Sequence, residues 1–300
     1  MFKNAIIYAI SPEWNQGLDE AEQAIAKRKF VECGATQRIS IGFVPPREDH
    51  GALIESIGGE WVLKVRIDTR KVPADTLKKR VDELAAQVED NTGRKPGKKQ
   101  RAELKEQAEL ELMPLAFVKT STTLVWIDRA HRLLLIDTSS ATRSEEVITA
   151  LVKAMDGFAV TLLQTKDSAA TAMTSWLKTG EPPACFTVDR ECELRSLDEM
   201  KSVIKYSRAL LDTDEVKGHI TSGKMATRLA MTWEGRISFV MTDALVIKKL
   251  AFLDVVFEGH KQGKEDAFDA DVAITTGELS KLIPDLIDAL GGLLVLDQAA

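Results

Sequence analysis

Short apolar runs alternate with amphipathic segments along the 300 residues of the chain. In the N-terminal third, Ile-, Val-, Phe- and Trp-rich runs typical of strands cover residues 4–10, 38–44 and 61–67. Residues 18–30 instead place Leu18, Ala21 and Ile25 on one helical face among charged residues, so we expect a helix there.

The pattern becomes helical from residue 73 to residue 112. Over the first stretch, apolar positions at spacings of four, three and four residues share one helix face: Leu77, Val81, Leu84 and Val88. Residues 91–97 contain two glycines and a proline, which interrupt the helix, and a second amphipathic stretch follows over 98–112. We therefore predict a helical hairpin that projects from the rest of the fold.

The remaining chain mixes both patterns. Residues 116–127 and 132–137 flank a polar turn and predict a β-hairpin. Further strands are expected at 158–163, 186–194, 203–208, 224–232, 236–242, 246–253 and 268–274. Further helices are expected at 144–155 (capped by Thr142 or Ser144), 169–177, 212–221 (capped by Asp212 or Thr213) and 278–290. Strands often follow strands, so the fold class is α+β, with antiparallel sheets and packed helices.

The overall charge initially argues against nucleic acid, because 40 Lys and Arg face 46 Asp and Glu, a net charge of −6. No apolar stretch approaches the length of about 18 residues that spans a bilayer, so no membrane partner is expected. The N-terminus predicts a first strand rather than a signal peptide. Three scattered cysteines, Cys33, Cys185 and Cys192, indicate reduced thiols in the cytoplasm.

Two sequence features suggest enzymatic chemistry. Residues 218–224 match the GxxxxGK pattern of a phosphate-binding loop, but Met225 occupies the place of the magnesium-binding Ser or Thr. This loop also follows a predicted helix and enters a predicted strand, the reverse of the required order. Asp269 and Asp271 would share one face of the predicted strand 268–274, where they could bind a cation, act as an acid–base pair or form part of a solvated acidic face. The histidines have no metal-ligand spacing, so we expect no metal, cofactor or catalytic residue.

The charge is distributed unevenly. Residues 94–105 carry six cations and one acid, a net charge of +5, whereas residues 254–300 carry ten acids and three lysines, a net charge of −7. On the predicted helices, acids four residues further on offset Lys78, Lys79, Lys99 and Lys105. The cations without such an acid are Arg94, Lys95, Lys98 and Arg101. They suit contact with phosphates, which carries no base sequence information.

The chain resembles the family of the bacterial recombination-associated protein RdgC almost from end to end. The order and spacing of several segments carry this resemblance. They are Phe2-Lys3-Asn4, Gly42-Phe43-Val44-Pro45-Pro46, Trp126-Ile127-Asp128, Ile237-Ser-Phe-Val-Met-Thr-Asp243, Leu250-Ala-Phe252, Phe268-Asp-Ala-Asp271, Thr276-Gly-Glu278 and Leu286-Ile-Asp-Ala-Leu-Gly-Gly292.

The resemblance implies a non-enzymatic, nucleoid-associated protein of the cytoplasm. Members form a ring-shaped homodimer that encircles duplex DNA with little sequence preference and restrains RecA-promoted strand exchange. The implied regions are a central αβ region (1–72 with 115–165), a helical finger (73–114) and a base (166–300). The expected DNA-contacting residues are Lys78, Lys79, Arg94, Lys95, Lys98, Lys99, Arg101, Lys105 and Lys119. Phe117 and Arg208 match positions near subunit contacts, while Leu115 and Ala209 depart from the family pattern.

Two other classes of function stay open at this point. One is a hydrolase that uses Lys224 on a nucleotide or the carboxylates Asp269 and Asp271. The other is an acidic scaffold whose basic hairpin binds a protein. Single-stranded DNA is a further candidate ligand, and the segment 293–300 has no assigned role.

Overall fold

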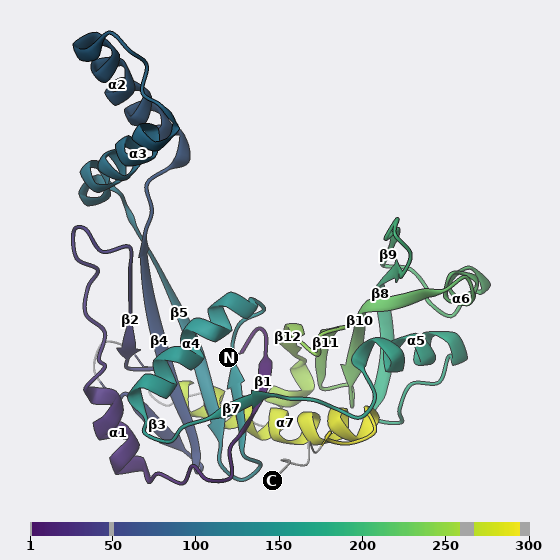
Figure 1. The fold of residues 1–300 in the computed structure, drawn as a ribbon. Helices are drawn as coiled ribbons and strands as arrows, with labels where there is room; N and C mark the ends of the chain where they lie inside the picture. Colours follow the sequence, from purple (N-terminus) through teal and green to yellow (C-terminus); the bar gives the residue numbers. More distant parts are fainter. Residues whose placement is uncertain (1, 48–50, 259–266, 295–300) are drawn as a thin grey trace, which may run out of the picture.

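Two antiparallel sheets organise the chain in the computed structural model, which describes residues 2–47, 51–258 and 267–294 (Figure 1). The strands are β1 (Ile6–Ile10), β2 (Ile39–Val44), β3 (Ile54–Ile57), β4 (Glu60–Arg70), β5 (Val118–Asp128), β6 (Leu133–Ile136), β7 (Val160–Leu162), β8 (Phe186–Ser196), β9 (Val203–Ser207), β10 (Lys224–Trp233), β11 (Ile237–Thr242) and β12 (Ile247–Phe252). The helices are α1 (Leu18–Ala26), α2 (Ala74–Thr92), α3 (Lys98–Leu112), α4 (Ala141–Ala154), α5 (Ala169–Thr179), α6 (Asp214–Thr221) and α7 (Ala267–Ala289), with short 3₁₀ turns η1 (Met113–Leu115) and η2 (Asp254–Phe257).

The first sheet has seven strands in the order β2-β4-β5-β6-β1-β7, with β3 paired to β4. Cross-strand partners such as Leu63 and Val125 face one side of the sheet, because side chains alternate along a strand. That side forms a core with Ile25 of α1 and Leu151 of α4. Helices α1 and α4 therefore cover one face of this sheet.

The second sheet has five strands in the order β12-β11-β10-β8-β9. Its apolar face, with Leu194 and Leu229, packs against Met173 of α5, Val216 of α6 and Leu282 of α7. The other face of this sheet carries the polar residues of the same strands. Helices α5, α6 and α7 therefore lie on one side of the sheet.

The two sheets share a core. Ala5 pairs with Ile247 through an isolated bridge, and Ile7 of the first sheet belongs to the same apolar cluster as the second sheet. Helix α7 runs from behind the first sheet to below the second sheet (Figure 1). It reaches the second sheet through the Arg236–Glu278 ion pair. The expected division of the chain into three regions stays a prediction.

Most predicted elements are confirmed within a few residues. The β-hairpin of β5 and β6 is present, and Thr213 caps α6 as expected. Helix α4 is capped by Ser140 rather than by Thr142 or Ser144, and β3 was not predicted. Helix α1 ends at Ala26, because the backbone from residue 28 to residue 30 hydrogen-bonds with β2 at Phe43.

The predicted strand at 268–274 is wrong. These residues belong to α7, a single helix that continues to Ala289. Buried positions at helical spacing, Val272, Leu279, Leu282 and Leu286, explain why the helix forms. The short alternation around Asp269 suggested a strand only because it was considered apart from this longer pattern.

Two glycine positions fix local geometry in the first sheet. Gly58 and Gly59 both have positive φ, +62° and +90°, which gives the tight turn between β3 and β4. Gly42 in β2 lies so close to residue 30 that a Cβ atom would be 2.4 Å from the Cα of Phe30.

Within the described ranges, none of the helices is both long enough and apolar enough to cross a bilayer.

Candidate nucleic-acid interface

Helices α2 and α3 pack against each other beyond the ends of β4 and β5 (Figure 1). They have an apolar core of their own, in which Leu84 and Ala85 of α2 meet Leu104 and Ala108 of α3. This cluster is separate from the cores of the two sheets. The amphipathic pattern predicted from the sequence therefore produces a helix pair with its own small core.

The base of the helix pair is attached to the first sheet by arginines. The Arg70 guanidinium at the end of β4 donates to the carbonyl oxygens of Met113, Pro114 and Ala116, at 3.1–3.3 Å. Arg38, next to β2, forms a 2.9 Å ion pair with Glu109 of α3. The neighbouring strands β4 and β5, which are paired from Arg70 and Val118 onwards, lead into and out of the pair.

Ion pairs also join the two helices. Arg80 of α2 contacts Glu111 of α3 at 2.8 Å, and this pairing holds the pKa of the Glu111 carboxyl below its usual range. Arg101 of α3 contacts Asp82 of α2 at 3.2 Å. The prediction that Arg101 lacks an acidic partner is therefore wrong, because its partner lies on the other helix rather than one turn away.

The expected pairs one turn apart are not formed either. Lys78, Lys79, Lys99 and Lys105 have no ion pair in the part of the chain that the structure describes. Three of the acids assigned to them bind arginines instead: Asp82 binds Arg101, Glu83 binds Arg80 and Glu109 binds Arg38. Arg101–Asp82 and Arg38–Glu109 join different elements, whereas Arg80–Glu83 lies within α2. The planar fork of arginine offers several donors, which favours these arginine pairs over local lysine pairs.

The tip of the helix pair is basic and open. Gly93 ends α2 in the left-handed conformation, with φ of +68°, and the turn exposes Arg94 and Lys95. Helix α3 begins after Gly97 without a side-chain cap and has Lys98 in its first turn. Arg94, Lys95 and Lys98 make no ion pair within the described residues. These three cations lie beside the N-terminus of α3, where the first backbone N–H groups have no partner within the helix.

The other predicted site residues lie apart from this tip. Lys119 is exposed on β5, and the side chain of Phe117, just before that strand, is 95% exposed. Arg208, also exposed, has a positive φ of 57° after β9, at the opposite end of the molecule from the helix pair (Figure 1). Within one chain, Phe117 and Arg208 therefore mark two distant surfaces.

The structure does not support the two enzymatic alternatives that the sequence left open. Residues 218–224 run from α6 into β10, so the phosphate-loop pattern has the wrong element order, as the sequence predicted. Asp269 and Asp271 lie two positions apart on α7, which places them on different helix faces rather than on one strand face. Asp269 instead pairs with Arg47. No group of three or more His, Cys, Asp or Glu side chains could hold a metal within the described ranges.

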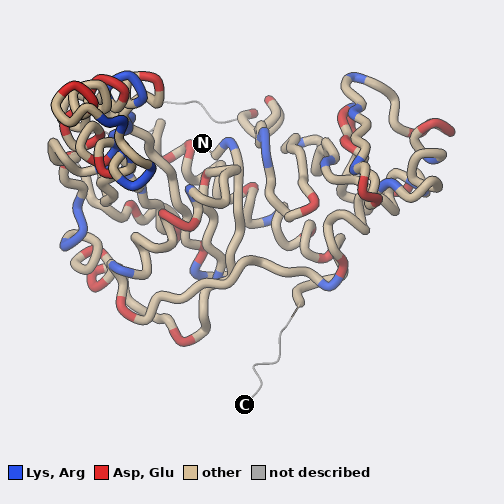
Figure 2. The backbone as a smooth tube through the Cα atoms, turned by 45° about the horizontal axis from the view of Figure 1, so that its top comes forward, with Lys and Arg blue, Asp and Glu red and all other residues tan. Residues whose placement is uncertain are grey.

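Some acids of the segment 254–300 are buried or half-buried inside the molecule rather than exposed on its outside. Glu278 is buried and bound by Arg236, and Asp285 accepts a 2.8 Å hydrogen bond from the indole N–H of Trp233. Acidic and basic residues are both present on the helix pair (Figure 2). The sharp charge separation read along the sequence is therefore weaker in three dimensions.

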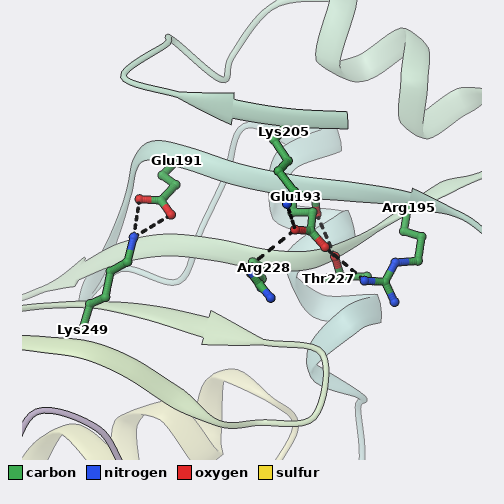
Figure 3. A network of polar contacts seen from close by, with 7 residues as sticks. All are labelled: Glu191, Glu193, Arg195, Lys205, Thr227, Arg228 and Lys249. Carbon is green, nitrogen blue, oxygen red and sulfur yellow. Dashed lines mark hydrogen bonds and ion pairs between the residues drawn. The ribbon is translucent and has the colours of Figure 1, made fainter. Parts of the chain in front are cut away.

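A second group of cations was not predicted from the sequence. Arg195, Lys205 and Arg228 come from three different strands and gather around Glu193 on the second sheet (Figure 3). The three cations are far apart in the sequence and belong to no run of basic residues, so the charge pattern does not indicate them. Strand register is the information that would have brought them together.

These features define an α+β protein with two antiparallel sheets and a helix pair whose tip is basic. The model of the family described as "Putative exonuclease, RdgC" matches residues 1–293. Relatives named recombination-associated protein RdgC include those of Dechloromonas aromatica (41% identical, covering 97% of both chains), Cupriavidus pinatubonensis (41%, covering 97% of this chain and 98% of the relative) and Bordetella pertussis (38%, with the same coverage). The chain belongs to the RdgC family.

Proposed function

We propose that this protein binds duplex DNA through its phosphate backbone, as a ring-shaped homodimer that restrains RecA-dependent recombination. The observation that carries DNA binding is the tip of the α2–α3 pair, the proposed finger, where Arg94, Lys95 and Lys98 are exposed and lack ion-pair partners among the described residues. The name of the relatives, which refers to recombination, is consistent with this proposal.

The proposed dimer contact includes Phe117. The phenyl ring is almost fully exposed, and its removal from water by a partner surface would lower the free energy of the dimer. Leu115, two residues earlier, is also 78% exposed and extends this apolar surface, although it departs from the family pattern. We place Arg208 at a second contact, so that two separate surfaces per chain close a ring with twofold symmetry.

DNA binding is tested by fluorescence anisotropy with a labelled duplex between about 50 and 200 mM salt, where phosphate-driven affinity changes steeply. The variant Arg94→Gln/Lys95→Gln/Lys98→Gln is expected to bind all sequences more weakly and to show a smaller salt slope. The matched control, Lys27→Gln/Lys153→Gln/Lys178→Gln, lowers the net charge equally at exposed helix ends elsewhere. Equal affinities of the two triple variants would contradict the assignment of the finger.

The family description also names an exonuclease, so the same experiment needs an activity arm. The purified protein is incubated with end-labelled linear duplex and Mg²⁺, and shortening of the strands is followed. Our proposal expects the DNA to remain intact while it is bound. A nuclease activity that copurifies with the protein would contradict our proposal and favour an enzymatic function.

A further inference from the structure

The second sheet has a polar face that its helices do not cover. Its core face packs against α5, α6 and α7, and the alternate side chains therefore point away from them. On this face, Glu193 of β8 lies opposite Lys205 of β9 and Arg228 of β10 in the strand register. Arg195 follows two residues later on the same strand and shares the face.

These residues form a compact cluster around one carboxylate (Figure 3). The Glu193 oxygens lie 3.1 Å from Arg195, 3.5 Å from Lys205 and 3.7 Å from Arg228. The hydroxyl of Thr227, which lies at a bulge in β10, donates to the same carboxylate at 2.9 Å. Glu193 thus contacts a residue on each of three strands.

The carboxylate is buried while its cations are not. The Glu193 side chain is only 5% exposed, whereas those of Arg195, Lys205 and Arg228 are 45%, 69% and 48% exposed. Burial opposes ionisation, but the Thr227 hydrogen bond and the charges of Arg228 and Lys205 together hold the pKa of Glu193 below its usual range. One negative and three positive charges leave the cluster with an excess of positive charge facing solvent.

We propose that this cluster is a second contact site for DNA phosphates and that Glu193 is its positioning residue. This inference rests on the proposed function. A phosphate can bind the outward N–H groups of the three cations, because Glu193 occupies only their inner side. The cluster and the finger lie toward opposite ends of the molecule, so the two sites engage separate stretches of a duplex backbone (Figure 1).

A neighbouring ion pair shows what distinguishes the cluster. Lys249 of β12 binds Glu191 of β8 through both carboxylate oxygens, at 2.8 and 2.9 Å. The charges of Lys249 and Glu191 cancel, so this pair has no excess positive charge for an anionic ligand. The proposed site is therefore confined to the unbalanced group around Glu193.

The test replaces the cations without leaving Glu193 bare. In Arg195→Gln/Lys205→Gln/Arg228→Gln, the amide N–H groups can still donate to the carboxylate. A second variant adds Glu193→Gln, which removes the buried charge and guards against loss of fold. Lys27→Gln/Lys153→Gln/Lys178→Gln has the same charge change as the triple variant, Lys27→Gln/Lys153→Gln has that of the quadruple variant, and thermal unfolding of each variant verifies the fold.

Duplex affinity is measured across salt concentrations for all these proteins and for the finger variant. We expect both cluster variants to bind more weakly than their controls, by about tenfold or more, with a salt slope reduced by about one for each cation lost. If the parent and finger variants behave as proposed but the cluster variants match their controls, this inference fails and the proposed function stands. If the parent does not bind duplex DNA, both fail.

The single variant Glu193→Gln tests the positioning role. It raises the net charge, so a carboxylate that merely cancels charge predicts tighter DNA binding. A carboxylate that holds the cations in place predicts weaker binding, with partial recovery in Glu193→Asp. Tighter binding by Glu193→Gln would overturn the positioning role.

Discussion

At the residue scale, the least exposed acids show how single side chains are stabilised by their partners. Glu278 of α7 is buried, and the Arg236 guanidinium binds it with two hydrogen bonds of 2.6 and 2.7 Å. This bidentate contact ties the start of β11 to the long helix. The hydrogen bond from Arg236 outweighs the effect of burial and holds the pKa of Glu278 below its ordinary value of 4.5.

Replacing this carboxylate should destabilise the fold in a pH-dependent manner. Glu278→Gln loses the charged hydrogen bonds, so we expect the free energy of unfolding to fall by about 1–3 kcal/mol at pH 7. The pKa is lower in the folded state, so the unfolded state takes up the proton first as pH falls below about 4.5. The parent's advantage should therefore shrink with acid and vanish below the folded pKa.

Urea unfolding of the parent and Glu278→Gln between pH 7 and pH 3 measures this difference. Glu258→Gln, at an exposed acid, is the control and should leave stability nearly unchanged. An advantage of the parent that is undiminished at pH 3 would contradict the linkage.

At the element scale, the finger depends on a core that belongs to no other element. Leu104 of α3 is 9% exposed and lies in the four-residue buried cluster between the two helices. We expect Leu104→Ala to lose about 2–3 kcal/mol of local stability. Because that cluster is separate from the sheet cores, the loss should loosen the finger without unfolding the sheets.

Amide hydrogen exchange of residues 74–112 checks this expectation, together with duplex affinity. Exchange should accelerate there and DNA binding should weaken, while the amides of β4 and β5 stay protected. Leu110→Ala is the matched control, since this leucine on the same helix is 63% exposed. Uniformly faster exchange across both sheets would refute the independence of the finger core.

The Arg101–Asp82 pair leads to a prediction of increased function. Both side chains are more than half exposed, so breaking the pair should hardly change the thermal midpoint. Asp82→Asn frees Arg101 for phosphate, and we expect tighter duplex binding with a salt slope larger by about one. Asp75→Asn on the same helix makes the same charge change without freeing an arginine. Equal effects of the two variants would show that Arg101 adds no contact.

The elements also show where sequence reasoning is strong. Helices α2 and α3 were predicted closely, because long amphipathic patterns with a Gly-Pro interruption have few alternative interpretations. Pairing within the site was less predictable, since acids one turn away from the lysines were bound by arginines of the other helix, of the same helix or from beside β2. The cluster at Glu193 was missed because register, not spacing, brings its cations together.

At the scale of the whole molecule, the net charge of −6 says little about DNA binding. Some acids, such as Glu278 and Asp285, are bound by partners within the molecule, whereas the finger and the Glu193 cluster leave cations exposed. A surface can therefore be locally basic on an acidic protein. The sheets and helices place the finger and the Glu193 cluster toward opposite ends of the folded molecule (Figure 1).

The last prediction concerns ring closure, because a closed ring and an open clamp release DNA at different rates. If Phe117 seals a contact, Phe117→Glu places a charge where the partner surface must exclude water, and that contact should open while the proposed Arg208 contact still joins the two chains. We expect the parent to have twice the chain mass in light scattering and to leave a closed circular duplex far more slowly than a linear one. The variant should keep twice the chain mass through the Arg208 contact but leave both DNAs at similar rates. Val31→Glu, at another exposed apolar residue, is the control; a Phe117→Glu protein that stays dimeric and retains slow release from circles would rule out this contact as the closure.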